Sequence, residues 1–153
     1  MRTWSSRLGS IEQGDTKHTE IKDQGITIPA ALEQVCFATI GTAIEVHREL
    51  GPGFLESVYE EAMAIELATR SIRFERQVAV PVMYKGHVVA NHRLDLLIDS
   101  CVIVELKAVT ALEPVHAAQV ISYLKATGVQ VGLLVNFNVP LLKNGIRRFV
   151  WDL

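Results

Sequence analysis

The stretch Arg93-Leu-Asp-Leu-Leu-Ile-Asp-Ser-Cys-Val-Ile-Val-Glu-Leu-Lys-Ala108 predicts two apolar strands joined by a short turn. Side chains alternate across a strand, so Glu105 and Lys107 share one face of the second strand while Val104 and Leu106 share the other. Burying a carboxylate beside an ammonium in such a surface is costly unless the two charges are paired or hold an ion. The pattern therefore indicates a site, and a metal ion is the first candidate to occupy it.

The register of this hairpin decides whether Asp95 joins Glu105. The two carboxylates point the same way if Ile98 pairs with Val102, which leaves Asp99-Ser100-Cys101 as the loop. A two-residue turn would place Asp95 on the wrong face. In the longer-loop register the two Cβ atoms should lie about 5 Å apart. That separation suits one hard divalent cation bound through oxygen, Mg²⁺ or Mn²⁺.

Periodicity predicts the remaining elements. Apolar residues recur at intervals of three and four from Ile28, which is typical of an amphipathic helix, and Gly51-Pro52 ends it. Further along the chain the period falls to two, as expected for strands, and Lys85-Gly86 fits a tight hairpin connection. The expected elements are helices at 28–50 and 55–69, strands at 78–84, 88–98 and 101–108, a helix at 114–127, and strands at 129–136 and 145–151. The third and fourth strands should be parallel, and the last strand should lie at an edge.

Length and composition limit the organisation of the chain. It has 153 residues, 49% of them apolar, which fits one domain at 27–153 preceded by a polar segment, 1–26, that we expect to be a mobile tail. The net charge of −2 gives no sign of strong charge-driven nucleic-acid binding, so such a partner would be bound locally. Cys36 and Cys101 lack metal-ligand spacing and fit a reducing cytoplasm. No apolar run predicts membrane insertion or secretion.

Several motifs resemble the PD-(D/E)XK nuclease superfamily. Asp95, nine residues and then Glu105-x-Lys107 resemble its active-site signature, with Leu94 in place of the proline. Gln119-Val-Ile-Ser-Tyr123 resembles the Q-x-x-x-Y element of the RecB-like branch, and Gly53-Phe-Leu-Glu-Ser-Val-Tyr59 matches the element that names the bacterial GxxExxY proteins. The resemblance covers residues 30 to 151. It implies an α/β fold, a restriction-endonuclease-like three-layer sandwich with a mixed central β-sheet flanked by helices in the order αα-βββ-α-β.

The resemblance also implies metal-dependent phosphodiester hydrolysis. Asp95, Glu105 and the backbone carbonyl of Leu106 would hold Mg²⁺ or Mn²⁺, which would polarise the phosphate and lower the pKa of a water molecule. Lys107 would orient that water and stabilise developing negative charge. The competing interpretation of Asp95, Glu105 and Lys107 is a structural ion network on a strand surface.

Three helices supply further candidates. Glu56 is the first choice for an additional metal-binding carboxylate, and Glu60, one turn later, could take that place; both could instead be ordinary exposed helix residues. His47 lies on an apolar helix stripe, where a hydrogen-bonded core histidine competes with a metal ligand. Gln119 would approach the metal and Tyr123 the substrate backbone, and the alternative for both is packing with a polar tip.

The basic residues are the least specific candidates. Arg93 and Lys125 are candidate phosphate contacts, for which a solvated surface position is the plainer alternative, as it is for Arg147 and Arg148.

These observations predict a hydrolase, a small Mg²⁺- or Mn²⁺-dependent nuclease whose partner is nucleic acid, DNA before RNA. The alternative is a nucleic-acid- or partner-binding module that keeps the nuclease fold with little or no turnover, because the chain is acidic and lacks an obvious basic groove. A third interpretation is a hydrolase of a smaller phosphate ester. The sequence leaves open whether the protein is a homodimer.

Overall fold

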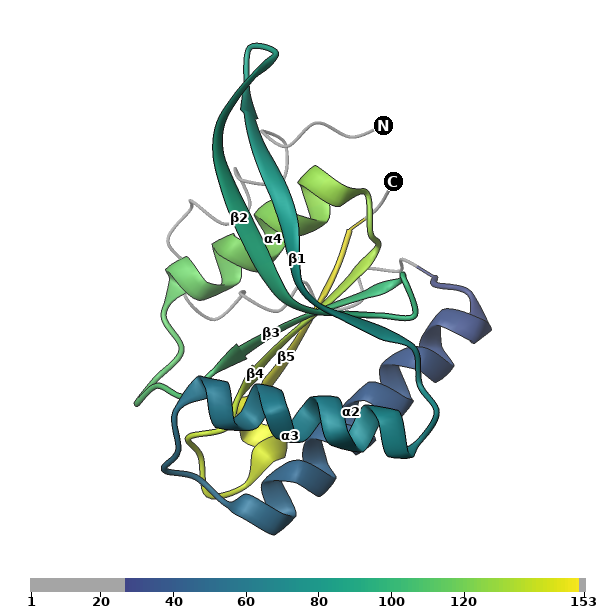
Figure 1. Ribbon diagram of the computed structural model, residues 1–153, viewed down its shortest axis with the longest axis vertical. Coiled ribbons are helices and arrows are strands. Elements are labelled where there is room, and N and C mark those ends of the chain that lie inside the picture. The colour runs from purple at the N-terminus through teal and green to yellow at the C-terminus, as the bar shows by residue number, and fades with distance from the viewer. Residues whose placement is uncertain (1–26, 152–153) are drawn as a thin grey trace.

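The structure, a computed structural model, describes residues 27–151 (Figure 1). The expected tail at 1–26 lies outside the described residues. The elements follow the predicted order, and their bounds are α2 (Ala30–Leu50), α3 (Glu56–Thr69), β1 (Phe74–Tyr84), β2 (His87–Ile98), β3 (Val102–Lys107), α4 (Pro114–Thr127), β4 (Val131–Asn136), the short 3-10 helix η1 (Leu142–Gly145) and β5 (Ile146–Val150). In the described part of the chain, no helix has the length and apolar content to cross a bilayer.

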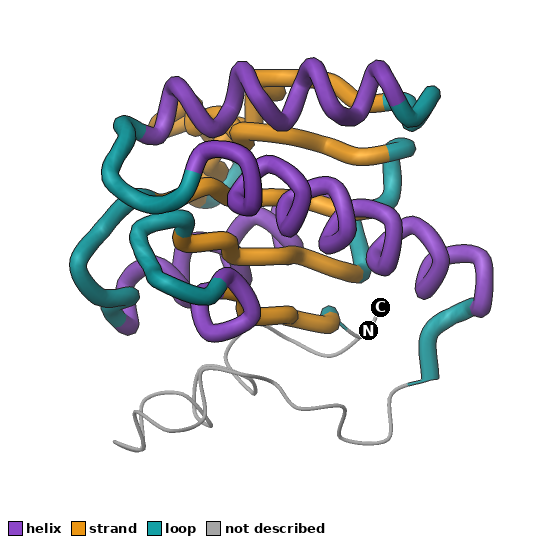
Figure 2. The backbone as a smooth tube through the Cα atoms, turned by 90° about the horizontal axis from the view of Figure 1, so that it is seen from below, coloured by secondary structure: helices purple, strands orange, loops and turns teal. Residues whose placement is uncertain are grey.

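The five strands form one mixed sheet in the order β1-β2-β3-β4-β5, and Figure 2 shows them side by side with helices packed on the sheet. β3 pairs in parallel with β4, and the other neighbours are antiparallel. The predicted parallel crossover and the edge position of the last strand are therefore confirmed. β3 lies at the centre, which explains why its sequence is almost continuously apolar.

The register of β2 and β3 is the one that the sequence predicted. Ile98 pairs with Val102 and Leu96 with Val104, which leaves residues 99–101 as the turn. Asp99 and Ser100 both have positive φ angles, of 46° and 57°, as a tight turn requires. Asp95 and Glu105 are the next residues beyond the last backbone pair.

Two apolar layers sandwich the sheet. One face packs against α2 and α3, where Cys36, Tyr59 and Met63 meet Val104 and Leu106 of the central strand. The other face packs against α4, where Val120, Ile121 and Leu124 meet Ile103.

Gly132 of β4 allows α4 to lie close to the sheet. A Cβ atom on Gly132 would come within 2.6 Å of Val120 Cγ1, so only a residue without a side chain fits beneath the helix. The helix lies over β3 and β4 for this reason, and it carries Gln119 and Tyr123 with it.

Candidate active site

Asp95 and Glu105 lie side by side where β2 and β3 separate. The Leu106 N–H donates to Asp95 Oδ2 at 2.8 Å, and the Asp95 N–H donates to Glu105 Oε1 at 3.2 Å. Each carboxylate thus accepts a hydrogen bond from the backbone of the neighbouring strand. The two side chains continue the connection between the strands where the backbone ladder ends, and this holds them next to each other.

Burial raises the pKa of both carboxylates, and for Glu105 the neighbouring negative charges add to the rise. Glu105 is 3% exposed, and burial together with the negative charges of Asp95 and Glu56 raises its pKa to about 8 against the hydrogen bond from Asp95 and the charge of Lys107. Burial also raises the pKa of Asp95, although the hydrogen bond from Leu106 and the charge of Lys107 oppose the change. A buried carboxylate with a raised pKa beside a second carboxylate is a candidate functional group.

Lys107 follows on the same face of β3 as Glu105. Its positive charge partly opposes the rise in pKa of both carboxylates, yet within the described residues no ion pair within 4.0 Å joins its ammonium group to either. Its backbone is fixed, because the Lys107 carbonyl accepts a hydrogen bond from Phe137 at 2.9 Å. Buried Asn136 stabilises the next turn through two hydrogen bonds with the backbone of Val109.

A cavity of about 190 Å³ opens beside Asp95 under the first turns of α3. Its lining includes Glu56, Glu60, Gln77 and the Leu106 segment. Glu56 is exposed and its charge acts on Glu105. Glu60 instead accepts hydrogen bonds from Arg76, at 2.8 Å, and from Gln77. Both predicted α3 carboxylates thus reach the site, but the charge of Glu60 is already paired.

The donors present fit a hard divalent ion. Within residues 27–151, no three His, Cys, Asp or Glu side chains gather into a group that could hold a metal by themselves. Asp95 and Glu105 provide two carboxylates, and Mg²⁺ is commonly held by one or two carboxylates, with water and phosphate oxygens completing its shell. The residues therefore suit Mg²⁺ or Mn²⁺ and do not suit an ion that needs a closed protein cage, such as structural zinc.

Gln119 and Tyr123 lie together on the α4 side of the site. Gln119 Nε2 donates to Tyr123 Oη at 2.9 Å, and the charges of Glu105 and Asp95 contribute, after burial, to raising the pKa of Tyr123. Both residues line a groove of about 700 Å³ between α4 and the β1–β2 hairpin, as does Lys125. The predicted helical pair is thus near the carboxylates and faces an open groove.

The other predicted residues take structural positions. His47 is buried, its Nε2 lies 2.8 Å from the Val139 carbonyl, and it is absent from the lining of the Asp95 cavity. Arg93 donates to the backbone carbonyl of Gln77 at 3.0 Å. Arg148 is not a solvated surface residue, because it forms two hydrogen bonds of 2.8 and 2.9 Å with Glu33 and ties β5 to α2.

Gln77 is the residue at the site that the sequence did not indicate. Its side-chain amide donates to Glu60 and, at 3.5 Å, to Asp95 Oδ1. A single glutamine in an extended polar segment carries no motif, so only the folded hairpin identifies it.

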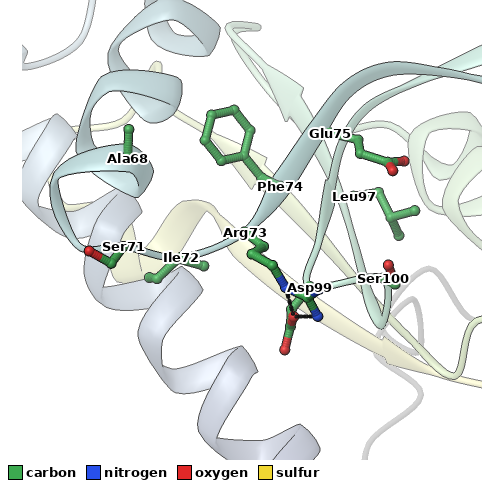
Figure 3. A pocket seen from close by; sticks show the side chains of 9 residues that line it. All are labelled: Ala68, Ser71, Ile72, Arg73, Phe74, Glu75, Leu97, Asp99 and Ser100. Atoms are coloured by element: carbon green, nitrogen blue, oxygen red, sulfur yellow. Dashed lines mark hydrogen bonds and ion pairs between the residues drawn. The ribbon is translucent and has the colours of Figure 1, made fainter.

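A third hollow, of about 570 Å³, lies near the β2–β3 turn (Figure 3). Arg73 and Asp99 meet in it, 2.6 Å apart, and satisfy each other's charge. Its lining contains none of the predicted site residues.

Comparison with known proteins gives one match. The family model of the PD-(D/E)XK nuclease superfamily matches residues 33–149, which include Asp95, Glu105 and Lys107. No curated protein and no solved structure matches the chain. The match covers most of the chain, and the mixed five-stranded sheet with its flanking helices is the restriction-endonuclease-like arrangement expected of that superfamily. The chain therefore belongs to the PD-(D/E)XK nuclease superfamily.

Proposed function

We propose that this protein is a Mg²⁺- or Mn²⁺-dependent nuclease that hydrolyses phosphodiester bonds of nucleic acid, with DNA the first substrate to test. The observation that carries the proposal is the pair of carboxylates, Asp95 and Glu105, held together by each other's strands. Lys107 follows two residues later on the same face. Superfamily membership supports the same chemistry.

Asp95, Glu105 and the carbonyl of Leu106 would hold the ion. When bound, the divalent ion supplies Lewis acidity, which neutralises phosphate charge and makes water a better nucleophile. Glu105 must lose its proton to serve as a ligand, so the raised pKa of about 8 predicts that binding releases a proton below that pH. The Leu106 N–H fixes Asp95 through one oxygen before the ion arrives.

Lys107 acts on the substrate rather than on the metal. No described carboxylate lies within ion-pair distance of its ammonium group, so the three N–H donors are available to a phosphate oxygen or to the attacking water. A cationic donor beside developing negative charge stabilises the transition state more than the bound substrate.

Two features support finer assignments. We assign Gln119 and Tyr123 the roles expected of the RecB-like branch, because they are hydrogen-bonded to each other and Tyr123 feels the charge of Glu105. Membership of the GxxExxY proteins is supported by Gly53, whose φ of 110° favours glycine, and by Tyr59, which donates to the Gly51 carbonyl at 2.6 Å. Both shape the loop that leads into Glu56.

One observation favours the alternative, a binding module with little turnover. The chain carries a net charge of −2, and basic side chains around the sheet are paired internally, Arg76 with Glu60 and Glu61, and Arg148 with Glu33. Such pairs leave fewer charges for phosphate than a high-affinity nuclease groove offers.

A cleavage panel tests the proposal. Wild type, Lys107→Ala and Asp95→Ala are assayed with Mg²⁺ and with Mn²⁺ on single- and double-stranded DNA and RNA. Lys107→Ala should keep its metal affinity and lose on the order of a hundredfold in cleavage rate. Asp95→Ala should lose both.

Lys85→Ala is the matched control, because Lys85 lies in the turn at the far end of the hairpin and contacts Tyr84 rather than a carboxylate. It should cleave like wild type. If wild type and Lys107→Ala both show negligible cleavage on every substrate but bind nucleic acid with an affinity that falls as salt rises, the binding module is the correct interpretation.

A further inference from the structure

The β1–β2 ladder is interrupted beside the carboxylates. Arg76 pairs with Leu96 and Val78 with Leu94, but the intervening residues, Gln77 and Asp95, do not pair. Gln77 has a φ of 50°, a left-handed conformation that costs a residue with a side chain on the order of 1 kcal/mol or more. Local backbone strain of this kind is often retained for function, and Gln77 lies beside the candidate active site.

At this interruption the side chains of both strands change the face of the sheet on which they pack. In β2, Ile98 and Leu96 pack in the layer of α2 and α3, whereas Leu94, which by simple alternation should join them, packs in the layer of α4. In β1, Phe74 belongs to the first layer, and Val78 belongs to the second. Gln77 and Asp95 are the residues at which the two strands exchange faces. Asp95 thereby contributes to the lining of the cavity beneath α3.

Gln77 also contacts the site directly. Its Nε2 donates both to Glu60 of α3 and to Asp95 Oδ1, the oxygen that the Leu106 N–H leaves free. Its carbonyl is held by Arg93 at 3.0 Å. Gln77 is exposed, so these polar contacts rather than core packing account for its place in the structure.

We propose that Gln77 is a positioning residue for the metal site, which orients the Asp95 carboxylate through Oδ1 and couples it to Glu60 of α3. The proposal rests on the proposed function. A glutamine suits this role because its amide donates to two carboxylates at once and carries no charge that would compete with a divalent ion for them. Arg93 assists by holding the Gln77 backbone in its left-handed conformation, which gives Arg93 a role other than phosphate contact.

Two variants separate the side chain from the backbone. Gln77→Met keeps the length of the side chain and removes the donor, while Gln77→Gly removes the side chain and relieves the strained φ. Isothermal titration with Mn²⁺ should give a dissociation constant at least about tenfold higher in both variants. Gln77→Gly should melt at or above the wild-type temperature in EDTA, which separates weakened metal binding from unfolding.

Lys85→Gly is the matched control, because Lys85 also has a positive φ, of 48°, but lies in the hairpin turn, where its ammonium group contacts the Tyr84 ring. Its Mn²⁺ affinity should equal that of wild type. If both Gln77 variants bind Mn²⁺ as tightly as wild type, Gln77 only shapes the hairpin and the proposal is overturned.

The same titration distinguishes this proposal from the proposed function. Weaker Mn²⁺ binding in the Gln77 variants of a wild type that cleaves nothing would support the positioning role and overturn the nuclease. Unchanged binding in variants of an active wild type would do the reverse. A wild type that binds no Mn²⁺ would overturn both.

Discussion

Glu105 carries the largest electrostatic cost of any single residue described at the site. It is buried in the central strand beside a second carboxylate, and the hydrogen bond from Asp95 does not offset the loss of solvent. Without a cation the folded protein therefore favours a protonated Glu105. An unfolded chain places the same group in water, where it titrates near its ordinary value of 4.5.

The free energy of unfolding in EDTA should consequently fall as pH rises from about 5 to 8. The folded state holds one more proton than the unfolded state in this window. The contribution of Glu105 to stability is therefore fully present below the unfolded pKa and is lost as pH rises through the folded pKa of about 8. The loss should approach, at most, about 5 kcal/mol. Urea denaturation at several pH values measures it.

Glu105→Gln is the control for this pH dependence. The variant has no proton to lose at that position, so its stability should change less than that of wild type across the same window. Equal slopes for the two proteins would place the responsible group elsewhere.

The sequence pointed to the charged residues of the candidate site, but not to Gln77. Asp95, Glu105 and Lys107 interrupt apolar strands. Because burying a charged group is costly, such interruptions can be recognised from the sequence alone. Gln77 lies in a polar segment, and its contacts depend on the place where β1 and β2 exchange faces, which no local sequence pattern encodes. For His47 the sequence left two interpretations open, because an apolar helix stripe cannot distinguish a metal ligand from a core histidine, and in the structure its Nε2 contacts the Val139 carbonyl.

Among the elements, α4 was predicted at its observed bounds, because Pro114 suits the first turn and Gly128, with a φ of 73°, ends the helix. Boundaries without such signals were less accurate. β1 begins at Phe74, four residues before its expected start, and Leu55, which falls at the expected start of the second helix, is 76% exposed and precedes α3. The polar start of β1 has no alternating pattern that would mark it as a strand. An apolar residue next to a helix, such as Leu55, cannot be told from a residue inside it.

The close packing of α4 on the sheet depends on Gly132. Gly132→Ala should destabilise the protein by about 1–3 kcal/mol, because the new methyl group would overlap Val120 unless the helix moves. Any displacement of α4 carries Gln119 and Tyr123 away from Glu105, so cleavage should fall as well. Thermal melting and the cleavage assay measure the two effects.

Gly41→Ala is the matched control. Gly41 lies inside α2, where a Cβ atom would meet only the end of the flexible Arg70 side chain, at 3.4 Å. Alanine is a better helix former than glycine by about 1 kcal/mol. The same substitution should therefore stabilise the protein at one glycine and destabilise it at the other; destabilisation of similar size at both would contradict the packing argument.

For the molecule as a whole, stability should depend on divalent ions. Mn²⁺ at a hundred times its dissociation constant should add about 2.7 kcal/mol to the free energy of unfolding, because the ion binds the folded chain. Thermal denaturation with and without Mn²⁺ measures it.

Asp95→Asn removes one of the two charges, and the increase should disappear in that variant. An equal increase in Asp95→Asn would show that Mn²⁺ binds elsewhere on the acidic surface.

The order of the strands in the sheet has a consequence for how the chain folds. Because the spatial order is the chain order, each strand pairs with its neighbours in sequence, and only the β3–β4 pair must wait for an intervening helix. Asp95 and Glu105 are ten residues apart on one such hairpin, so they meet after a short loop closes, with little loss of chain entropy. Their repulsion would thus arise early in folding, before α4 covers them, and an ion captured by the hairpin at that moment would speed folding while leaving the unfolding rate nearly unchanged.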